Sequence, residues 1–258
     1  MSEATKPTTL LDSAVAFLIE AFATYTANKQ SFAIVHAVTS AELVLKQRLA
    51  QIHPNLIFKN LDAQIIKDEQ TVSLRHLPRR LLNLGIKIDA QEIQLIHQCA
   101  NWRNQIVHHL PDFDATEAKV QFPKLLDFIA AFMRRELGTG IEKVLPATWY
   151  STADKILTDW QHAVTKAQAQ AMREGNVLGT ACPRCGGIPV LSLRDQRKVH
   201  CHLCGSDDYE YYECERCGCW TVGMPIVQPY YCSCCEQELS EEAGDEYISQ
   251  LIDLRRGK

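Results

Sequence analysis

The stretch SFAIVHAVTSAELVLKQRLAQIH, residues 31–53, decides how the first half of the chain folds. Its apolar residues recur every three or four positions, at Ile34, Val38, Ala41, Leu45, Leu49 and Ile52. This spacing predicts an α-helix that buries one side, because these positions all lie on that side. Pro54 ends the helix, since a proline keeps the residue before it out of the helical conformation.

Apolar stripes of the same kind occur on both sides of this stretch. They predict further helices at residues 9–27, 72–83, 89–109 and 114–138. Asp89 is the expected N-cap of the helix at 89–109, and Pro123 is expected to kink the helix at 114–138. Short connections between amphipathic helices favour an antiparallel bundle of four or five helices over residues 1–140.

The composition changes after the bundle. Residues 141–180 are expected to form a helical linker, with a helix at 150–174 and a flexible hinge in the stretch GNVLGTA. Residues 181–238 are rich in Cys, Gly and Tyr and alternate in short segments, and residues 239–258 predict a last helix. The sequence therefore predicts a mainly α protein in which a helical bundle precedes a small β-rich module.

Ten of the eleven cysteines lie between residues 182 and 235 and form two groups. The first group pairs Cys182-Pro-Arg-Cys185 with Cys201-His-Leu-Cys204, and the second pairs Cys214-Glu-Arg-Cys217 with Cys232-Ser-Cys-Cys235. This spacing is typical of zinc ribbons, in which two Cys-x-x-Cys turns surround one metal ion. The sequence therefore predicts two Zn²⁺ ions per chain, both structural, because four thiolates leave no open position on the metal.

Several alternatives stay open within this cysteine module. Cys219 and Cys234 each lie close to a predicted ligand of the second site, and either can take its neighbour's place. Disulfides are disfavoured by the lack of a secretion signal, and an iron–sulfur cluster is disfavoured by two evenly spaced groups. His200 and His202 flank Cys201 and are spare ligands. Cys99 stands alone on a helical apolar stripe, where a packing role is expected.

The charges of the two ribbons predict a different kind of partner for each. The formal net charge of -4 leaves no basic coat over the whole chain for non-specific binding of nucleic acid. The first ribbon nevertheless has basic residues that are expected to contact RNA, at Arg184, Arg194, Arg197 and Lys198. Residues 205–250 carry eleven acidic side chains, which would repel RNA and favour a protein partner for the second ribbon.

Neither a membrane span nor a leader peptide is expected. No stretch approaches about 18 uninterrupted apolar residues, and the N-terminus lacks a basic start followed by an apolar run. We therefore expect a cytoplasmic protein with no membrane partner.

An arginine followed five positions later by a histidine occurs three times, so this pattern alone does not identify a site. The three pairs are Arg48 with His53, Arg103 with His108, and Arg197 with His202. Only Arg103 is followed by a carboxamide, Asn104, and Asn104 and His108 lie on one helical face because they are four residues apart. Histidine is suited to proton transfer near neutral pH, and arginine offers a fixed fork of donors for phosphate oxygens.

The motif Arg103-Asn104-x-x-x-His108 resembles the signature of the HEPN ribonucleases, which are helical bundles. The run Ala41-Glu42-Leu43-Val44-Leu45-Lys46 is also similar to the second helix of that family, and the likeness covers roughly residues 9–138. The resemblance implies a metal-independent endoribonuclease with one composite site between two copies of the chain, from a toxin or antiviral defence system. Leu110 stands where some HEPN toxins carry a modified tyrosine, which puts that form of control in doubt.

Two other hypotheses compete with catalysis at Arg103. In the first, Arg103 forms an ion pair with Glu42 inside the bundle, because Glu42 lies beside an apolar stripe and needs a partner if it is buried. This pair is also compatible with catalysis, with Glu42 holding Arg103 in place. In the second, the chain is a non-catalytic adaptor that dimerises through its bundle and binds RNA or a protein through its ribbons.

Overall fold

The computed structural model describes residues 9–60, 70–108 and 115–178, and parts of the cysteine module. Those parts are residues 182, 184–185, 187, 190–193, 198–207, 209–213 and 220–223, with the backbone alone described for 115–118, 210–213 and 220–223. The second cysteine group and the predicted helix at 239–258 lie outside the described residues. The chain divides into two compact units, residues 1–161 and 162–258, and each is considered by itself.

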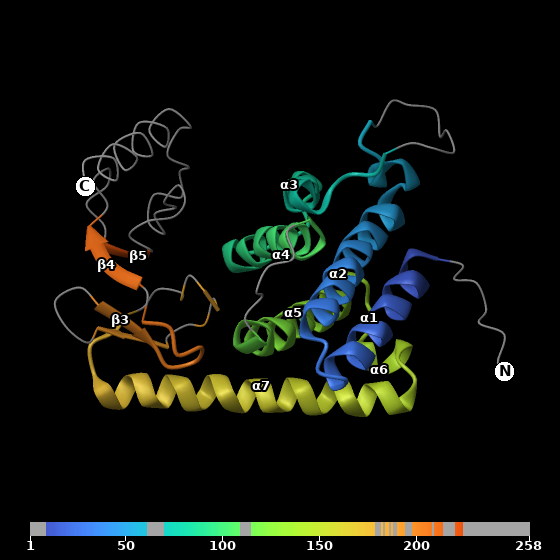
Figure 1. Ribbon diagram of the computed structural model, residues 1–258. Coiled ribbons are helices and arrows are strands. Elements are labelled where there is room, and N and C mark those ends of the chain that lie inside the picture. Colours follow the sequence, from blue (N-terminus) through green and yellow to red (C-terminus); the bar gives the residue numbers. More distant parts are fainter. Residues whose placement is uncertain are drawn as a thin grey trace. The chain divides into compact units, whose positions relative to one another are not determined.

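The first unit is a bundle of helices, as the sequence predicts (Figure 1). Its five longer helices are α1 (Leu10–Thr26), α2 (Gln30–Ile52), α4 (Ala90–His108), α5 (Ala115–Glu136) and the first half of α7 (Ala147–Glu174). The shorter helical segments are η1 (Pro54–Ile57), η2 (Leu74–His76), α3 (Leu77–Asn83) and α6 (Ile141–Val144). The predicted helix at 72–83 is therefore split between a 3-10 turn and a short α-helix.

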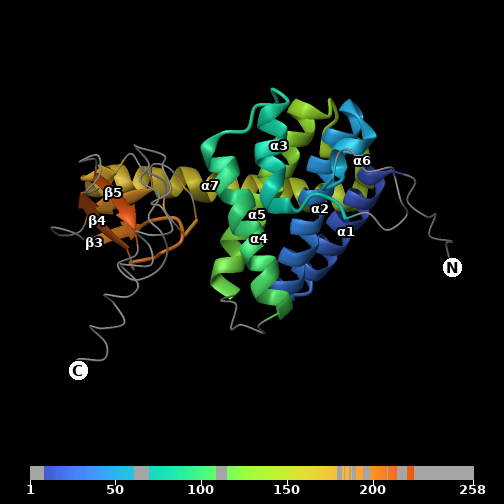
Figure 2. The ribbon, with the colours of Figure 1, turned by 90° about the horizontal axis from the view of Figure 1, so that it is seen from above.

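The centre of the bundle is α2, which packs against α1, α4 and α5. Its predicted apolar stripe is buried at Ile34, Val38, Ala41, Leu45 and Leu49, whereas Ile52 at its end is 43% exposed. Both views of the ribbon show α1 alongside α2 (Figures 1 and 2). Burial of this stripe fixes the orientation of α2. The polar residues of α2 that lie next to the stripe therefore face the neighbouring helices.

The start of α4 follows the capping rules. Asp89 accepts a hydrogen bond from the backbone of Glu92, and the Glu92 carboxylate accepts one from the backbone of Asp89. This capping box begins α4 where the sequence predicts it. Helix α5 continues through Pro123 without a break in its assignment, although the ring removes one backbone donor.

The bundle extends beyond residue 140. Ile141 of α6 is buried, and so is Ala153 on the first half of α7. Trp149 stacks on Phe22, with ring centroids 6.1 Å apart. The boundary between the two units accordingly falls within α7, between residues 161 and 162, and not at residue 140.

The second unit contains an antiparallel sheet. Its strands are β1 (Val177–Leu178), β2 (Leu191–Leu193), β3 (Lys198–Cys201), β4 (Tyr209–Glu213) and β5 (Trp220–Gly223). They lie in the sheet in chain order, each paired with the next. The stretch expected to be a hinge instead enters β1, because left-handed backbone at Gly175 and Asn176 ends α7 and turns the chain towards β2.

Among the helices of the described ranges, none combines the length and the apolar character that crossing a membrane requires.

Candidate functional site

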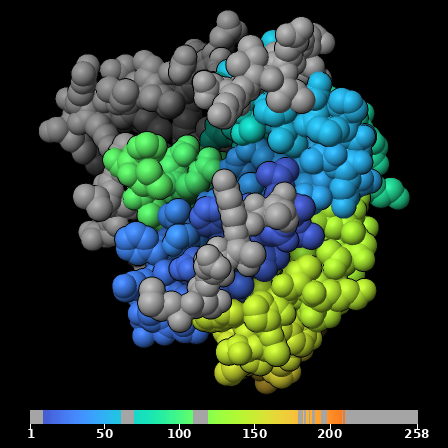
Figure 3. Space-filling view, turned by 90° about the vertical axis from the view of Figure 1, so that its right-hand side faces the viewer, coloured from blue at the N-terminus to red at the C-terminus, as the bar shows by residue number. Residues whose placement is uncertain are grey.

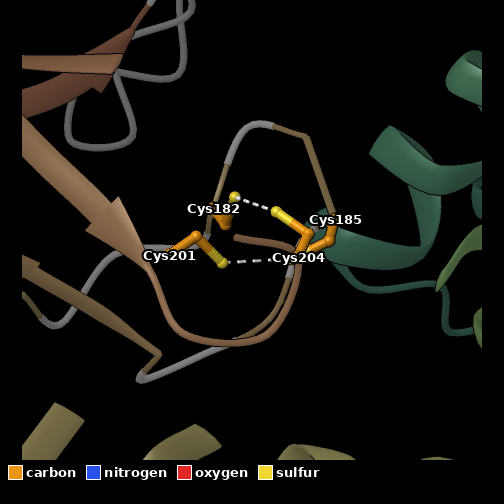
Figure 4. A group of neighbouring side chains, drawn as sticks. All are labelled: Cys182, Cys185, Cys201 and Cys204. Atoms are coloured by element: carbon orange, nitrogen blue, oxygen red, sulfur yellow. Dashed lines mark hydrogen bonds between the residues drawn. The ribbon is translucent and has the colours of Figure 1, made fainter. Parts of the chain in front are cut away.

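The first predicted cysteine group comes together as one cluster. Cys182, Cys185, Cys201 and Cys204 have their sulfur atoms within 4.8 Å of one another. The Sγ atoms of Cys182 and Cys204 are 3.8 Å apart, and those of Cys185 and Cys201 are 3.6 Å apart. A tetrahedron of about 2.3 Å metal–sulfur bonds separates its sulfurs by about 3.8 Å, so the cluster has the size of a zinc site. Figure 4 shows the four side chains converging from two turns.

The backbone of each turn explains this convergence. The Cys182 amide donates to the Gly187 carbonyl, and the Cys201 amide donates to the Ser206 carbonyl. Gly205 has a φ of 71°, a conformation that glycine adopts without strain. An added Cβ at Gly187 would lie 2.8 Å from a methyl group of Leu203, so a side chain has little room there. Both turns therefore close tightly and direct two thiols to the same point.

The electrostatics of the cluster favour a bound cation. Hydrogen bonds with Cys182 and the other two cysteines, together with burial, hold the pKa of the Cys185 thiol above its ordinary value. The pKa of Cys201 lies well below its ordinary value because Cys182, Cys185 and Cys204 donate to its thiolate. Four crowded sulfurs cannot all ionise without a balancing positive charge, and one divalent cation supplies it.

The two histidines beside the cluster have partners of their own. The His202 Nε2 atom lies 2.8 Å from the Ser192 hydroxyl and 3.5 Å from a Glu174 carboxylate oxygen. The His200 Nδ1 atom lies 2.7 Å from Asp207. Neither histidine is part of the cluster of possible ligands, so the described residues supply a metal site from cysteines alone.

Only some of the other residues predicted to function in the cysteine module lie within the described residues. Cys214, Cys217, Cys232 and Cys235 lie outside the described residues, as do the alternative ligands Cys219 and Cys234. Arg194 and Arg197 also lie outside them. Of the other two predicted RNA-binding residues, Arg184 lies in the first turn of the cluster, and Lys198 is exposed on β3.

The predicted ion pair between Arg103 and Glu42 is present. Arg103 Nη1 of α4 donates to Glu42 Oε2 of α2, and the other oxygen of Glu42 accepts from Lys46 Nζ at 2.6 Å. Lys46 Nζ also donates to the Thr71 hydroxyl at 2.8 Å. The side chains of Lys46, Glu42 and Arg103 are 8%, 14% and 30% exposed, so the carboxylate links two largely shielded cations. Lys46 was not predicted here, although its i, i+4 spacing from Glu42 is the signal for such a pair.

The other two residues of the motif face solvent. Asn104 and His108 are both exposed, and so is Val107, which is 58% exposed. The green atoms of α4 reach the surface of the bundle beside the blue atoms of α1 and α2 (Figure 3). The structure thus separates the motif into a shielded arginine, fixed by Glu42, and an accessible carboxamide and imidazole.

The arginine–histidine pair at 48 and 53 has a structural role. Arg48 Nε lies 3.5 Å from a carboxylate oxygen of Glu136, and His53 Nδ1 accepts a hydrogen bond from the Asn55 amide. These contacts tie the end of α2 to α5 and begin η1. The third pair includes Arg197, which lies outside the described residues.

Cys99 and His36 belong to the packing of the bundle. Cys99 is 1% exposed, and burial raises the pKa of its thiol to about 12. His36 stacks on Phe17 with ring centroids 6.1 Å apart. The predicted packing role of Cys99 is confirmed.

Comparison with known proteins gives no assignment. No family model, no curated protein and no solved structure matches the chain. Any function must therefore be argued from the geometry and chemistry of the residues themselves.

Proposed function

We propose that the protein is a metal-independent endoribonuclease whose site is formed by Arg103, Asn104 and His108. The observation that supports this best is the arrangement on α4. Asn104 and His108 are exposed on one face, one turn apart, while the adjacent Arg103 is held in place by Glu42. A fixed cation and an accessible imidazole are the groups that cleavage of a phosphodiester requires.

The proposed reaction is an internal transfer within RNA. His108 takes the proton of a ribose 2′-hydroxyl, and the oxygen forms a bond to the adjacent phosphorus. The bond from phosphorus to the 5′-oxygen breaks, and that oxygen receives a proton from a second imidazole in its protonated form. The products are a 2′,3′-cyclic phosphate and a 5′-hydroxyl. Arg103 and Asn104 stabilise the additional negative charge on the phosphate oxygens.

A second copy of the chain is the natural source of that second imidazole. Five helical residues place Arg103 and His108 about 140° apart around α4, which makes a loose site in one copy. Val107, an exposed apolar residue beside His108, suits contact with another copy. We therefore place the site at the interface of a homodimer.

The cysteine cluster has a structural part in this proposal. Zn²⁺ bound by Cys182, Cys185, Cys201 and Cys204 would hold the two turns together and leave no position for a substrate. A second Zn²⁺ at the other cysteine group, RNA contacts from the basic residues of the first ribbon, and a protein partner for the acidic second ribbon extend the proposal. A cytoplasmic toxin or antiviral effector is the setting that the HEPN resemblance implies.

The adaptor hypothesis has one observation in its favour. The Arg103–Glu42–Lys46 cluster ties α2 to α4, so an active site is not needed to explain why these three residues are present. An adaptor would bind RNA or a protein without cutting RNA.

Incubation of the purified protein with total RNA distinguishes the two functions. With free divalent ions chelated, we expect cleavage to continue and the new ends to be 2′,3′-cyclic phosphates and 5′-hydroxyls. Cleavage that stops when Mg²⁺ is withdrawn and returns with it would indicate a metal nuclease. Intact RNA under all conditions would favour the adaptor.

A further inference from the structure

A second arginine lies beside the exposed face of α4. Arg75 of η2 donates from Nη2 to the Asn101 side-chain oxygen of α4, at 2.7 Å. Arg75 is itself exposed, and η2 packs against α4. This contact places a guanidinium group at the surface of the helix that carries the proposed catalytic residues.

Asn101 belongs to the same stripe of α4 as Asn104 and His108. Residues seven apart on an α-helix differ by only about 20° in direction and by about 10.5 Å along the axis. Asn101 and His108 are therefore nearly in line, and Asn104 lies between them along the axis and about 60° to one side. Because Asn101 holds Arg75, the guanidinium sits at the beginning of this stripe.

Arg75 and Arg103 differ in what their donors already bind. Arg103 donates from one nitrogen to a carboxylate, which orients it and offsets part of its charge. Arg75 donates one hydrogen bond to a neutral carboxamide, and it has no carboxylate partner among the described residues. A guanidinium that has no counter-charge among the described residues, and that donates one hydrogen bond there, is suited to bind phosphate oxygens in a bidentate manner.

We propose that Arg75, oriented by Asn101, binds a backbone phosphate of single-stranded RNA lying along the Asn101–Asn104–His108 stripe, next to the phosphate that is cleaved. Arg75 is thus a substrate-binding residue, and Asn101 is its positioning residue. The inference rests on the proposed ribonuclease function, because it assigns a second phosphate subsite to the same site.

The first test is the salt dependence of RNA binding. An oligonucleotide with 2′-O-methyl groups throughout serves as the probe, since it lacks the hydroxyl that attacks. Arg75→Ala should raise Kd about tenfold and flatten the slope of log K against log salt by about 0.7, the contribution of one phosphate on a single strand. Arg75→Lys should restore the slope because it keeps the charge. Arg134→Ala is the matched control, since Arg134 is an arginine of the same unit whose side chain is 70% exposed.

The second test separates binding from chemistry and examines the role of Asn101. With cleavable RNA, Arg75→Ala should raise KM and leave kcat at saturating substrate unchanged. Asn101→Ala should weaken binding less than Arg75→Ala does. The double variant should be no weaker than Arg75→Ala alone, because Asn101 acts through Arg75.

The outcomes for this inference and for the proposed function are distinct. If wild-type protein cleaves RNA but Arg75→Ala keeps its Kd and its salt slope, the phosphate subsite at Arg75 is wrong and the nuclease stands. A fall in kcat with KM unchanged would also overturn the binding role. If the wild-type protein neither binds nor cleaves RNA, both proposals fail.

Discussion

At the scale of single residues, Glu42 is the side chain on which most of the candidate site depends. It accepts from Lys46 through one oxygen and from Arg103 through the other, and it is 14% exposed. A shielded carboxylate is expensive to bury unless its charge is matched, and here two cations match it. Its removal would leave Lys46, whose side chain is 8% exposed, with Thr71 as its remaining partner.

Glu42→Gln should therefore destabilise the bundle more than Arg103→Ala does. We expect a loss of about 2 kcal/mol in the free energy of unfolding for Glu42→Gln, because it leaves two cations without a counter-charge. Arg103→Ala should lose about 1 kcal/mol, since Glu42 keeps Lys46 and the arginine is partly exposed. Urea denaturation of the three proteins measures both values. Equal stability of Glu42→Gln and the wild type would show that the cluster adds nothing to the fold.

Cys99 gives the bundle a stability that depends on pH. Burial raises the pKa of its thiol from 9.0 to about 12, so the folded state keeps its proton where the unfolded state loses it. The resulting stability is complete below pH 9 and falls by about 1.4 kcal/mol per pH unit between pH 9 and pH 12. Urea denaturation at pH 8 and pH 10.5 should show a steeper loss for the wild type than for Cys99→Ala. The same loss in both proteins would contradict a neutral buried thiol.

At the scale of helices and strands, the sequence predicts what depends on local spacing. The stripe from Ile34 to Leu49 and the capping box of Asp89 and Glu92 are local patterns, and the helices begin and end close to the predicted residues. The cluster of Cys182 and Cys204 was predictable for the same reason, since the Cys-x-x-Cys spacing fixes each turn.

Other features depend on tertiary contacts that spacing does not reveal. The first half of α7 belongs to the bundle because Trp149 stacks on Phe22, a residue far away in the sequence. The expected hinge became β1 because Val177 and Leu178 pair with β2. No sequence pattern indicated a role for Arg75, because its proposed role depends on the contact with Asn101, which lies 26 residues away in the sequence.

Loss of the metal should affect the strands of the cysteine unit and leave the helices of the bundle unchanged. Removal of the proposed zinc by a strong chelator, or the change Cys182→Ser, should unfold β2 and β3, because metal binding supplies much of the folding free energy of so small a module. Hydrogen exchange should then rise in β2 and β3 while α2 stays protected, because the four cysteines of the cluster all lie in the second unit. Continued protection of β2 and β3 without metal would contradict a structural metal site.

The metal count tests the second cysteine group independently. Native mass measurement should find two zinc ions per chain in the wild type and one in Cys182→Ser. A single ion in the wild type, lost in Cys182→Ser, would leave the second group without metal.

At the scale of the whole molecule, a helical unit that carries the proposed chemistry precedes a unit organised by cysteines. The proposed site uses α4 from two copies, so its activity should depend on self-association. Chelation that unfolds the cysteine unit should spare cleavage of a short RNA, because no step of the proposed reaction passes through the metal. The effect of chelation on cleavage should therefore depend on the length of the RNA, since basic residues of the first ribbon are proposed to contact longer substrates.

The most direct test of the central claim is the initial rate of RNA cleavage in the presence of chelator for the wild type, His108→Ala and His53→Ala. His53 is the matched control because it follows Arg48 with the same spacing and has a structural contact with Asn55. We predict that His108→Ala loses at least about 100-fold in rate, since general acid–base catalysis contributes on that order, while His53→Ala keeps the wild-type rate. Cleavage by His108→Ala at the wild-type rate would contradict the assignment of this site.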